Sequence, residues 1–217
     1  MSALLADLQQ LPLFVAAGLL LNITPGVDMA LVLRSSAAQG WRAGAAAALG
    51  ISAGCSVHIA TAALGIGALL AGAPTALALL QWAGAAYLVW LGIGLLRTRA
   101  GASAQPPDPA RALRRLFAQG FLTNALNPKV ALFFLAFVPQ FIVPAPAHPA
   151  GAFVLLGSVF VVNSTVVSLA IAALGAVLHR HLAARPGWQR LGPWLNRGVG
   201  ALFIALGLKL ALDAPGR

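Results

Sequence analysis

Long apolar stretches alternate with short polar ones along the whole chain. A helix that crosses the hydrocarbon of a bilayer needs about 20 predominantly apolar residues. Stretches of that length predict six transmembrane helices, over residues 11–33, 43–70, 74–97, 117–142, 150–178 and 193–213. Because several of them exceed the minimum, we expect tilted helices or ends that lie in the membrane interface. The predicted fold is therefore an all-α integral membrane protein.

The composition supports this assignment. Hydrophobic residues make up 60% of the 217 residues and charged residues only 8%, whereas a soluble domain is about 25% charged. Six spans with short connections leave no room for a separate soluble domain. The chain has one cysteine, Cys55, which excludes an intramolecular disulfide and a cysteine-based metal site.

Basic residues gather in alternate connections between the spans. Arg34 and Arg42 lie in the first connection, further arginines lie between residues 97 and 115 in the third, and others lie between residues 180 and 197 in the fifth. The positive-inside rule places these three connections in the cytoplasm and both termini outside. The net charge of +10 is therefore interpreted as juxtamembrane charge. Binding of nucleic acid is not predicted, because the basic residues lie between apolar runs rather than on one face.

The spans divide into two groups of three. Residues 1–99 hold the first group and residues 117–217 the second, and the segment 100–116 between them is expected to be a cytoplasmic linker. Because three is odd, two homologous halves would have opposite orientations, as in the inverted repeats of many secondary transporters. The sequence thus predicts a 3+3 inverted repeat.

Polar residues and a proline interrupt the first and the fourth span, within NITPG at residues 22–26 and NALNPK at residues 124–129. A Thr or Asn can cap a new helix, and proline suits its first position, where the backbone needs no N–H partner. Both spans are therefore expected to stop and restart, with Thr24-Pro25 and Asn127-Pro128 at the new starts. An ordinary proline kink, common in membrane helices, is the alternative.

A helix that restarts inside a membrane has chemical consequences. Its first N–H groups lack helical partners and carry the positive end of the helix dipole. Within the hydrocarbon such groups must find partners or line a cavity, and a carboxylate is a natural ligand for them. Two interruptions in opposed halves therefore predict a binding site near the middle of the membrane.

These motifs resemble those of the LysE/RhtB family of bacterial amino-acid exporters, with its threonine-, homoserine- and leucine-type efflux proteins. The resemblance covers essentially the whole chain and rests on Pro25-Gly26, the small residues from Gly40 through Gly54, Asn127-Pro128-Lys129, Phe133-Phe134 and Pro139-Gln140-Phe141. The family often has Pro-Gly-Pro where this chain has Pro25-Gly26-Val27. The resemblance implies export of amino acids or close derivatives across the bacterial inner membrane, driven by the proton gradient.

Two charged residues accompany the interruptions. An Asp at the bilayer centre costs about 2.5–3.5 kcal/mol even on the milder insertion scales, so Asp28 is expected to carry the coupling proton or to bind a substrate ammonium. A structural Asp favoured by the helix dipole is the alternative. Lys129 could bind a substrate carboxylate, pair with Asp28, or snorkel to the interface, although it lies roughly 20 Å along the helix from Arg115. One acid and one base suit a zwitterionic neutral amino acid.

Uncharged polar residues complete the predicted site. Asn22, Thr24, Asn124 and Asn127 could line the cavity or bond between helices, and His58 in the second span could relay protons or have a structural role. No metal ligand or cofactor is predicted. The candidate residues for substrate binding and coupling are Asp28, Lys129, Asn127, Asn124, Pro25, Gly26, Thr24, Asn22, Pro128 and His58.

The leading hypothesis is a secondary transporter that exchanges an amino acid for protons. A metal-ion or small inorganic-anion exporter is the alternative, and it would call for more membrane carboxylates or histidines than Asp28 and His58 supply. An intramembrane aspartyl protease needs two carboxylates, and no Walker A pattern indicates ATP hydrolysis, so no enzymatic activity is predicted. The expected partners are the substrate, protons and membrane lipid, and a homodimer is compatible with the sequence.

Overall fold

The computed structural model describes residues 5–64, 74–97, 109–183 and 188–212, and the secondary structure in these ranges is helical apart from an isolated bridge between Leu8 and Ile142. The helices are α2 (Leu11–Ile23), α3 (Val27–Gln39), α4 (Trp41–Ala63), α6 (Pro74–Leu96), α7 (Pro109–Ala125), α8 (Pro128–Leu132), the π-helical turn η1 (Phe133–Phe137), the 3-10 turn η2 (Val138–Phe141), α9 (Pro149–Ala183) and α10 (Trp188–Leu212). The all-helical prediction is confirmed. Helix α7 begins before the expected start of the fourth span at residue 117, so the end of the expected linker is helical.

Both expected interruptions are present. Helices α2 and α3 meet at an angle of 58° across the first, and α7 and the segment Pro128–Phe141 meet at 47° across the second. By length and composition, Trp41–Ala63 and Pro149–His181 can each cross a membrane, and within the described residues the number of candidate spans rises to four if each bent pair counts as one. At each proline motif one helix ends and a new one begins, so these are breaks rather than kinks within a continuous helix.

The two restarts differ in detail. At the second, Asn127 is the N-cap of α8 and Pro128 its first residue, as predicted. At the first, the prediction is wrong: Gly26 is the N-cap of α3, which begins at Val27, and no side chain caps it. The hydroxyl of Thr24 donates instead to the carbonyl of Leu20 at 2.6 Å, so Thr24 closes the end of α2 rather than opening α3.

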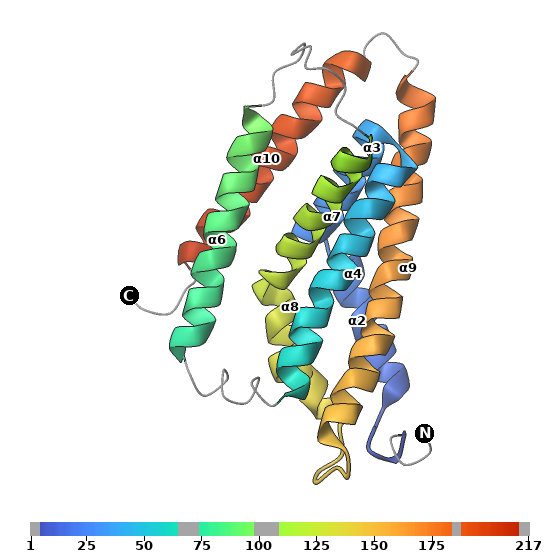
Figure 1. Ribbon diagram of the computed structural model, residues 1–217, viewed down its shortest axis with the longest axis vertical. Coiled ribbons are helices and arrows are strands. Elements are labelled where there is room, and N and C mark those ends of the chain that lie inside the picture. The colour runs from blue at the N-terminus through green and yellow to red at the C-terminus, as the bar shows by residue number, and fades with distance from the viewer. Residues whose placement is uncertain (1–4, 65–73, 98–108, 184–187, 213–217) are drawn as a thin grey trace.

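Glycines bring two pairs of helices into backbone contact. A Cβ atom at Gly50 or Gly54 of α4 would collide with the backbone of Phe117 or Phe121 on α7. In the same way, a Cβ at Gly92 of α6 would lie 2.6 Å from the carbonyl oxygen of Gly200 on α10. Such small-residue contacts are typical of helix pairs in membranes. Helices α4 and α7 form one tight pair and α6 and α10 another, and the second pair lies to one side of the molecule (Figure 1).

An aromatic cluster fills the space around the π-helical turn. Phe133 and Phe134 lie at its start, with ring centroids 5.7 Å apart, and both pack against Phe160 of α9. Phe14 of α2 and Phe141 of η2 continue the cluster, with centroids 5.2 Å apart. Phe133, Phe134 and Phe141 are thus core residues that hold the second bent helix against α2 and α9, whereas Pro139 and Gln140 of the Pro-Gln-Phe motif are exposed.

The arginine-bearing helix ends gather at one end of the molecule. In Figure 1, α3 ends, α4 begins, α6 ends, α7 begins and α9 ends towards the top, whereas η2 and the start of α9 lie at the bottom. These helix ends flank the first, third and fifth connections of the predicted topology, of which residues 98–108 and 184–187 lie outside the described residues. The orientation in the membrane stays a prediction.

Candidate functional site

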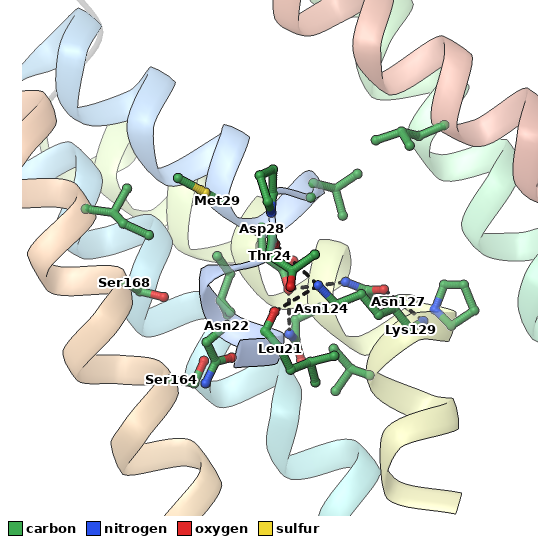
Figure 2. A pocket seen from close by; sticks show the side chains of 18 of the residues that line it. Leu21, Asn22, Thr24, Asp28, Met29, Asn124, Asn127, Lys129, Ser164 and Ser168 are labelled. Atoms are coloured by element: carbon green, nitrogen blue, oxygen red, sulfur yellow. Dashed lines mark hydrogen bonds between the residues drawn. The ribbon is translucent and has the colours of Figure 1, made fainter. Parts of the chain in front are cut away.

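A cavity of about 250 Å³ lies where the two interruptions meet. Its walls come from the end of α2, the start of α3, the junction of α7 and α8, and facing residues of α4, α6, α9 and α10. Figure 2 shows the polar side chains converging on its centre. All but one of the ten predicted site residues line this cavity; the exception is His58.

Asp28 is the acid at the centre of the site. It lies in the first turn of α3, where the helix dipole favours a negative charge. Its Oδ2 accepts hydrogen bonds from Asn124 Nδ2 at 3.0 Å and Asn127 Nδ2 at 3.2 Å. Its Oδ1 is buried and receives no hydrogen bond from the residues that the structure describes. One carboxylate oxygen is therefore held in place, whereas the other has no hydrogen-bond partner among the described residues.

Asn127 has two roles at the second interruption. Its Oδ1 accepts from the backbone N–H of Lys129 at 3.1 Å, which caps α8. Its amide nitrogen donates to Asp28, as described above. Because both groups of the amide are engaged, the orientation of the side chain is fixed. The same cap also occupies the N–H of Lys129, so that this donor does not remain free for a substrate carboxylate.

Lys129 reaches across to the first interruption. Its ammonium donates to the carbonyl oxygens of Leu21 at 3.0 Å and Thr24 at 3.4 Å. These carbonyls lie at the C-terminal end of α2, where a cation is favourable. Of the ion pairs among the described residues, none joins Lys129 to Asp28, so the direct pairing of the two charges, one of the alternatives for Lys129, is not formed. Lys129 lines the cavity.

The remaining predicted residues differ in their contacts with the cavity. Asn22 lines it and has a buried Nδ2 with no hydrogen-bond partner among the described residues. Thr24 lines it with its side chain turned back to α2, and Pro25, Gly26 and Pro128 shape its walls.

His58 lies behind the cavity rather than in its wall. It is 6% exposed, its Nε2 lies 2.9 Å from the backbone oxygen of Asn124, and its ring stacks on Phe134. Because a carbonyl oxygen only accepts, His58 donates from Nε2 and is held in that tautomer. The same carbonyl accepts from the N–H of Asn127. His58 therefore positions the end of α7, and no contact connects it directly with Asp28.

Three polar residues of the cavity were not predicted. Ser164 and Ser168 of α9 and Lys209 of α10 line it together with the residues of the interruptions. The serines lie in a long apolar helix and Lys209 near its own helix end, so that nothing in their local sequence indicated a common site. Only the packing of α9 and α10 against the interruptions brings them there. No group of three His, Cys, Asp or Glu residues that could hold a metal ion occurs in the described ranges.

Known proteins resemble the chain over nearly its full length. The LysE type translocator family matches residues 19–214. A homoserine/homoserine lactone efflux protein of Salmonella typhi is 32% identical over 192 residues, which cover 88% of this chain and 91% of the relative. A leucine efflux protein of Klebsiella pneumoniae subsp. pneumoniae is 27% identical over 202 residues, which cover 91% and 92%.

A third relative carries no assigned activity. It is an uncharacterized membrane protein of Vibrio cholerae serotype O1, 32% identical over 198 residues, which cover 91% of this chain and 94% of the relative. No solved structure gives a significant match. The apolar helices and these relatives identify a multi-pass bacterial membrane protein. The match over residues 19–214 and the motifs at both interruptions show that the chain belongs to the LysE type translocator family, the LysE/RhtB family that its sequence resembles.

Proposed function

We propose that the protein exports a neutral amino acid or a close derivative from the cytoplasm, in exchange for protons, across the bacterial inner membrane. The names of its relatives, efflux proteins for homoserine, homoserine lactone and leucine, support an amino-acid substrate. The observation that carries the proposal is Asp28, which lines the cavity at the meeting point of two interrupted helices and whose buried Oδ1 has no described hydrogen-bond partner.

The cavity suits a small zwitterion. Its volume of about 250 Å³ lies just below the range of roughly 300–1,000 Å³ for sites that hold drug-sized ligands. The substrate ammonium would bind Asp28 Oδ1, and the carboxylate would bind the ammonium of Lys129. Apolar residues on the other walls, among them Ile51, Leu88 and Leu206, would contact an uncharged side chain. Among the described residues, the cavity has no second acid for the side chain of a dibasic substrate.

Coupling follows from having one acid in the cavity. A carboxylate in a site with little water needs a cation to balance its charge. Asp28 would hold either the substrate ammonium or a proton, but not both. If the empty carrier returns only with Asp28 protonated, each outward movement of substrate is matched by an inward movement of a proton. Asn124 and Asn127 would keep the carboxylate in place in both states.

The interrupted helices also support an inverted repeat. Each of the expected halves, residues 1–99 and 117–217, begins with a bent helix pair, α2–α3 in the first and α7–α8 in the second. With α4, α6, α9 and α10 as further spans, this gives six, with the arginine-rich end in the cytoplasm and both termini outside. We take these features as part of the proposal.

Transport in proteoliposomes tests the proposed function. The purified protein would be reconstituted with an imposed pH gradient and offered homoserine, leucine and lysine. We expect uphill movement of a neutral amino acid together with proton flux, and weaker transport of lysine. Transport without proton flux would contradict antiport, and a failure to move any amino acid would contradict the proposal as a whole.

Replacement of Asp28 tests the coupling role. Asp28→Asn keeps the size of the side chain and removes the charge, so we expect uphill export to be lost. Asp7→Asn is the matched control, because Asp7 is the other acid within the described residues and lies outside the cavity. Uphill export by Asp28→Asn at the wild-type rate would exclude Asp28 as the proton carrier.

A further inference from the structure

A second hollow, of about 1050 Å³, lies at the arginine-rich end of the molecule between α3, α6 and α7. It shares no lining residue with the cavity of the candidate site. Its polar wall contains Arg34, Arg97, Arg111, Arg114 and Arg115. The proposed export of an amino acid does not use this basic pocket.

The positive charges of Arg97, Arg111, Arg114 and Arg115 are brought together in the basic pocket. The acids that the structure describes, Asp7 and Asp28, both lie elsewhere. No ion pair joins Arg97, Arg111, Arg114 or Arg115 to an acid within the described residues. Arg34 and Arg115 are near enough for their charges to repel each other. A cluster of this kind is electrostatically unfavourable until an anion is bound.

Three of these arginines also lie at a helix end that disfavours positive charge. Arg111, Arg114 and Arg115 occupy the first two turns of α7, which begins at Pro109. The N-terminal end of a helix carries a positive partial charge, so it disfavours cations and favours anions. Guanidinium groups also match the geometry of phosphate oxygens through paired hydrogen bonds. The charge pattern therefore favours a phosphate group at the start of α7.

The other wall of the basic pocket is apolar. Trp90 and Ile93 of α6 line it and are 65% and 36% exposed. Leu91 and Leu95 of the same helix and Leu116 of α7 lie deeper in it. Trp is common at the level of lipid headgroups, where one side of its ring meets hydrocarbon. A ligand that fills this pocket must combine an anionic head with apolar chains.

We propose that the basic pocket binds the headgroup of an anionic phospholipid from the cytoplasmic leaflet, with its acyl chains along Trp90 and Ile93. Basic pockets between membrane helices are known sites for such headgroups. A free phosphate would leave the apolar wall exposed. A zwitterionic amino acid would bring an ammonium group for which the pocket offers no acid among the described residues.

Lipid binding to the purified protein tests the proposal. Native mass spectrometry in a neutral detergent would compare phosphatidylglycerol and phosphatidylcholine with the same acyl chains. We expect phosphatidylglycerol to bind preferentially and to raise the melting temperature. Equal binding of the two lipids to the wild-type protein would overturn the proposal without the need for a variant.

A pair of triple variants locates the site. Arg111→Gln, Arg114→Gln and Arg115→Gln together should weaken phosphatidylglycerol binding on the order of 100-fold, since each arginine contributes roughly five-fold near an anionic surface. Arg42→Gln, Arg180→Gln and Arg197→Gln together form the matched control, because these exposed arginines lie outside the pocket. If both triples bind the lipid equally, the pocket is not the site. If the triple variant of Arg111, Arg114 and Arg115 fails to fold, the three single variants are measured instead. Each should bind phosphatidylglycerol roughly five-fold more weakly than the wild type.

Competition separates a lipid from a soluble anion. Inorganic phosphate and the unlabelled amino acids of the transport panel would be added to the lipid complex. We expect neither to displace phosphatidylglycerol or to reproduce its thermal stabilisation. Stabilisation by inorganic phosphate equal to that by the lipid would overturn the proposal in favour of a soluble anion. Displacement by an amino acid would overturn it in favour of a substrate vestibule.

Discussion

Asn124 on α7 donates a hydrogen bond of 3.0 Å to Asp28 on α3, and this bond joins the two interrupted helices directly. The donor precedes the second interruption and the acceptor follows the first. Asn127 adds a parallel bond from the far side of the second interruption. The carboxylate of one half of the chain is therefore oriented by two amides of the other half.

The strength of the Asn124–Asp28 bond reports the charge of Asp28. In a double-mutant cycle with Asn124→Ala and Asp28→Ala, a bond to an ionised acceptor should give a coupling energy of about 1.5–3 kcal/mol in the free energy of unfolding. Neutral bonds between membrane helices average only about 0.6 kcal/mol. We expect the larger value at neutral pH, measured by unfolding in detergent. A coupling near 0.6 kcal/mol would indicate that Asp28 is protonated in the resting protein.

The cap at Asn127 can be separated from its bond to Asp28. Asn127→Ala removes both, whereas Asn127→Ser keeps a capping oxygen and removes the amide that reaches Asp28. Loss of an N-cap costs about 0.5–2 kcal/mol, so the Ala variant should be less stable than the Ser variant by that amount. Thermal unfolding in detergent measures the difference. Equal stability of the two variants would show that the cap contributes nothing to stability. Transport should be impaired in both variants, because both lose the amide that bonds Asp28.

Replacing Lys129 tests carboxylate recognition. Loss of a charged hydrogen bond costs about 1.5–3 kcal/mol, so Lys129→Met should weaken substrate binding roughly ten- to a hundred-fold. Lys209→Met is the matched control, because Lys209 lines the same cavity but lies on α10. Substrate binding to detergent-solubilised protein measures both variants. If Lys209→Met weakened substrate binding more than Lys129→Met, Lys209 and not Lys129 would be the residue that binds the substrate carboxylate.

The glycine contacts predict position-specific intolerance to alanine. At Gly50 and Gly54 an added Cβ meets the backbone of α7, so each Ala variant should lose at least about 1–3 kcal/mol of stability. At Gly94 and Gly198 nothing lies within 4 Å of the added Cβ. Alanine there should be neutral or stabilise by roughly 0.5–1 kcal/mol. Melting temperatures of the four variants test this, and equal losses at all four would contradict the described packing.

Asp7 should make stability depend on pH. Its Oδ1 accepts from the N–H of Ala147 at 3.0 Å and its Oδ2 from the N–H of His148 at 2.9 Å. The bond from Ala147 is the main cause of a lowered pKa of Asp7, and the bond from His148 adds to it. A lowered pKa in the folded state means that stabilisation is complete above the unfolded pKa, about 3.9. It is lost as the pH falls through the lower pKa of the folded state.

Melting curves from neutral to acid pH check this prediction. Asp7→Asn should be less stable than the wild type at neutral pH, and the difference should shrink below about pH 4. Gln9→Ala is the control, because Gln9 bonds the carbonyls of Gln140 and Ile142 in the same region without a titratable group. Its effect should not vary with pH. A pH-independent effect of Asp7→Asn would contradict the role of its charge.

Much of the fold follows from local sequence. The apolar runs determine the helices, and the proline motifs determine where two of them bend, because both effects act within a few residues. The error at Thr24 has an equally local cause. A Thr hydroxyl can bond backward to a carbonyl four residues earlier or forward as a cap, and the choice depends on Gly26, which extends the chain before α3 begins.

The site was only partly predictable. Asp28, Asn124, Asn127 and Lys129 were found because charged or amide groups beside a proline are unusual in a membrane helix. Their partners could not be predicted: the bonds of Lys129 to the α2 carbonyls depend on the angle between two bent helices. Ser164, Ser168 and Lys209 join the site through the placement of α9 and α10, which no local motif indicates.

The two glycine-mediated helix contacts restrict how the protein can change shape. Each joins a helix of the first predicted group of three spans with a helix of the second: α4 with α7, which begins at Pro109, and α6 with α10. Because backbones in such close contact cannot slide past each other without collision, we expect each pair to move as one rigid unit. The cavity is lined from both units, with Ile51 and Asn124 on the first and Leu88 and Leu206 on the second. Access to Asp28 from the two sides of the membrane is therefore expected to alternate through tilting of α6 and α10 together against the rest, and not through separation of the two sequence halves.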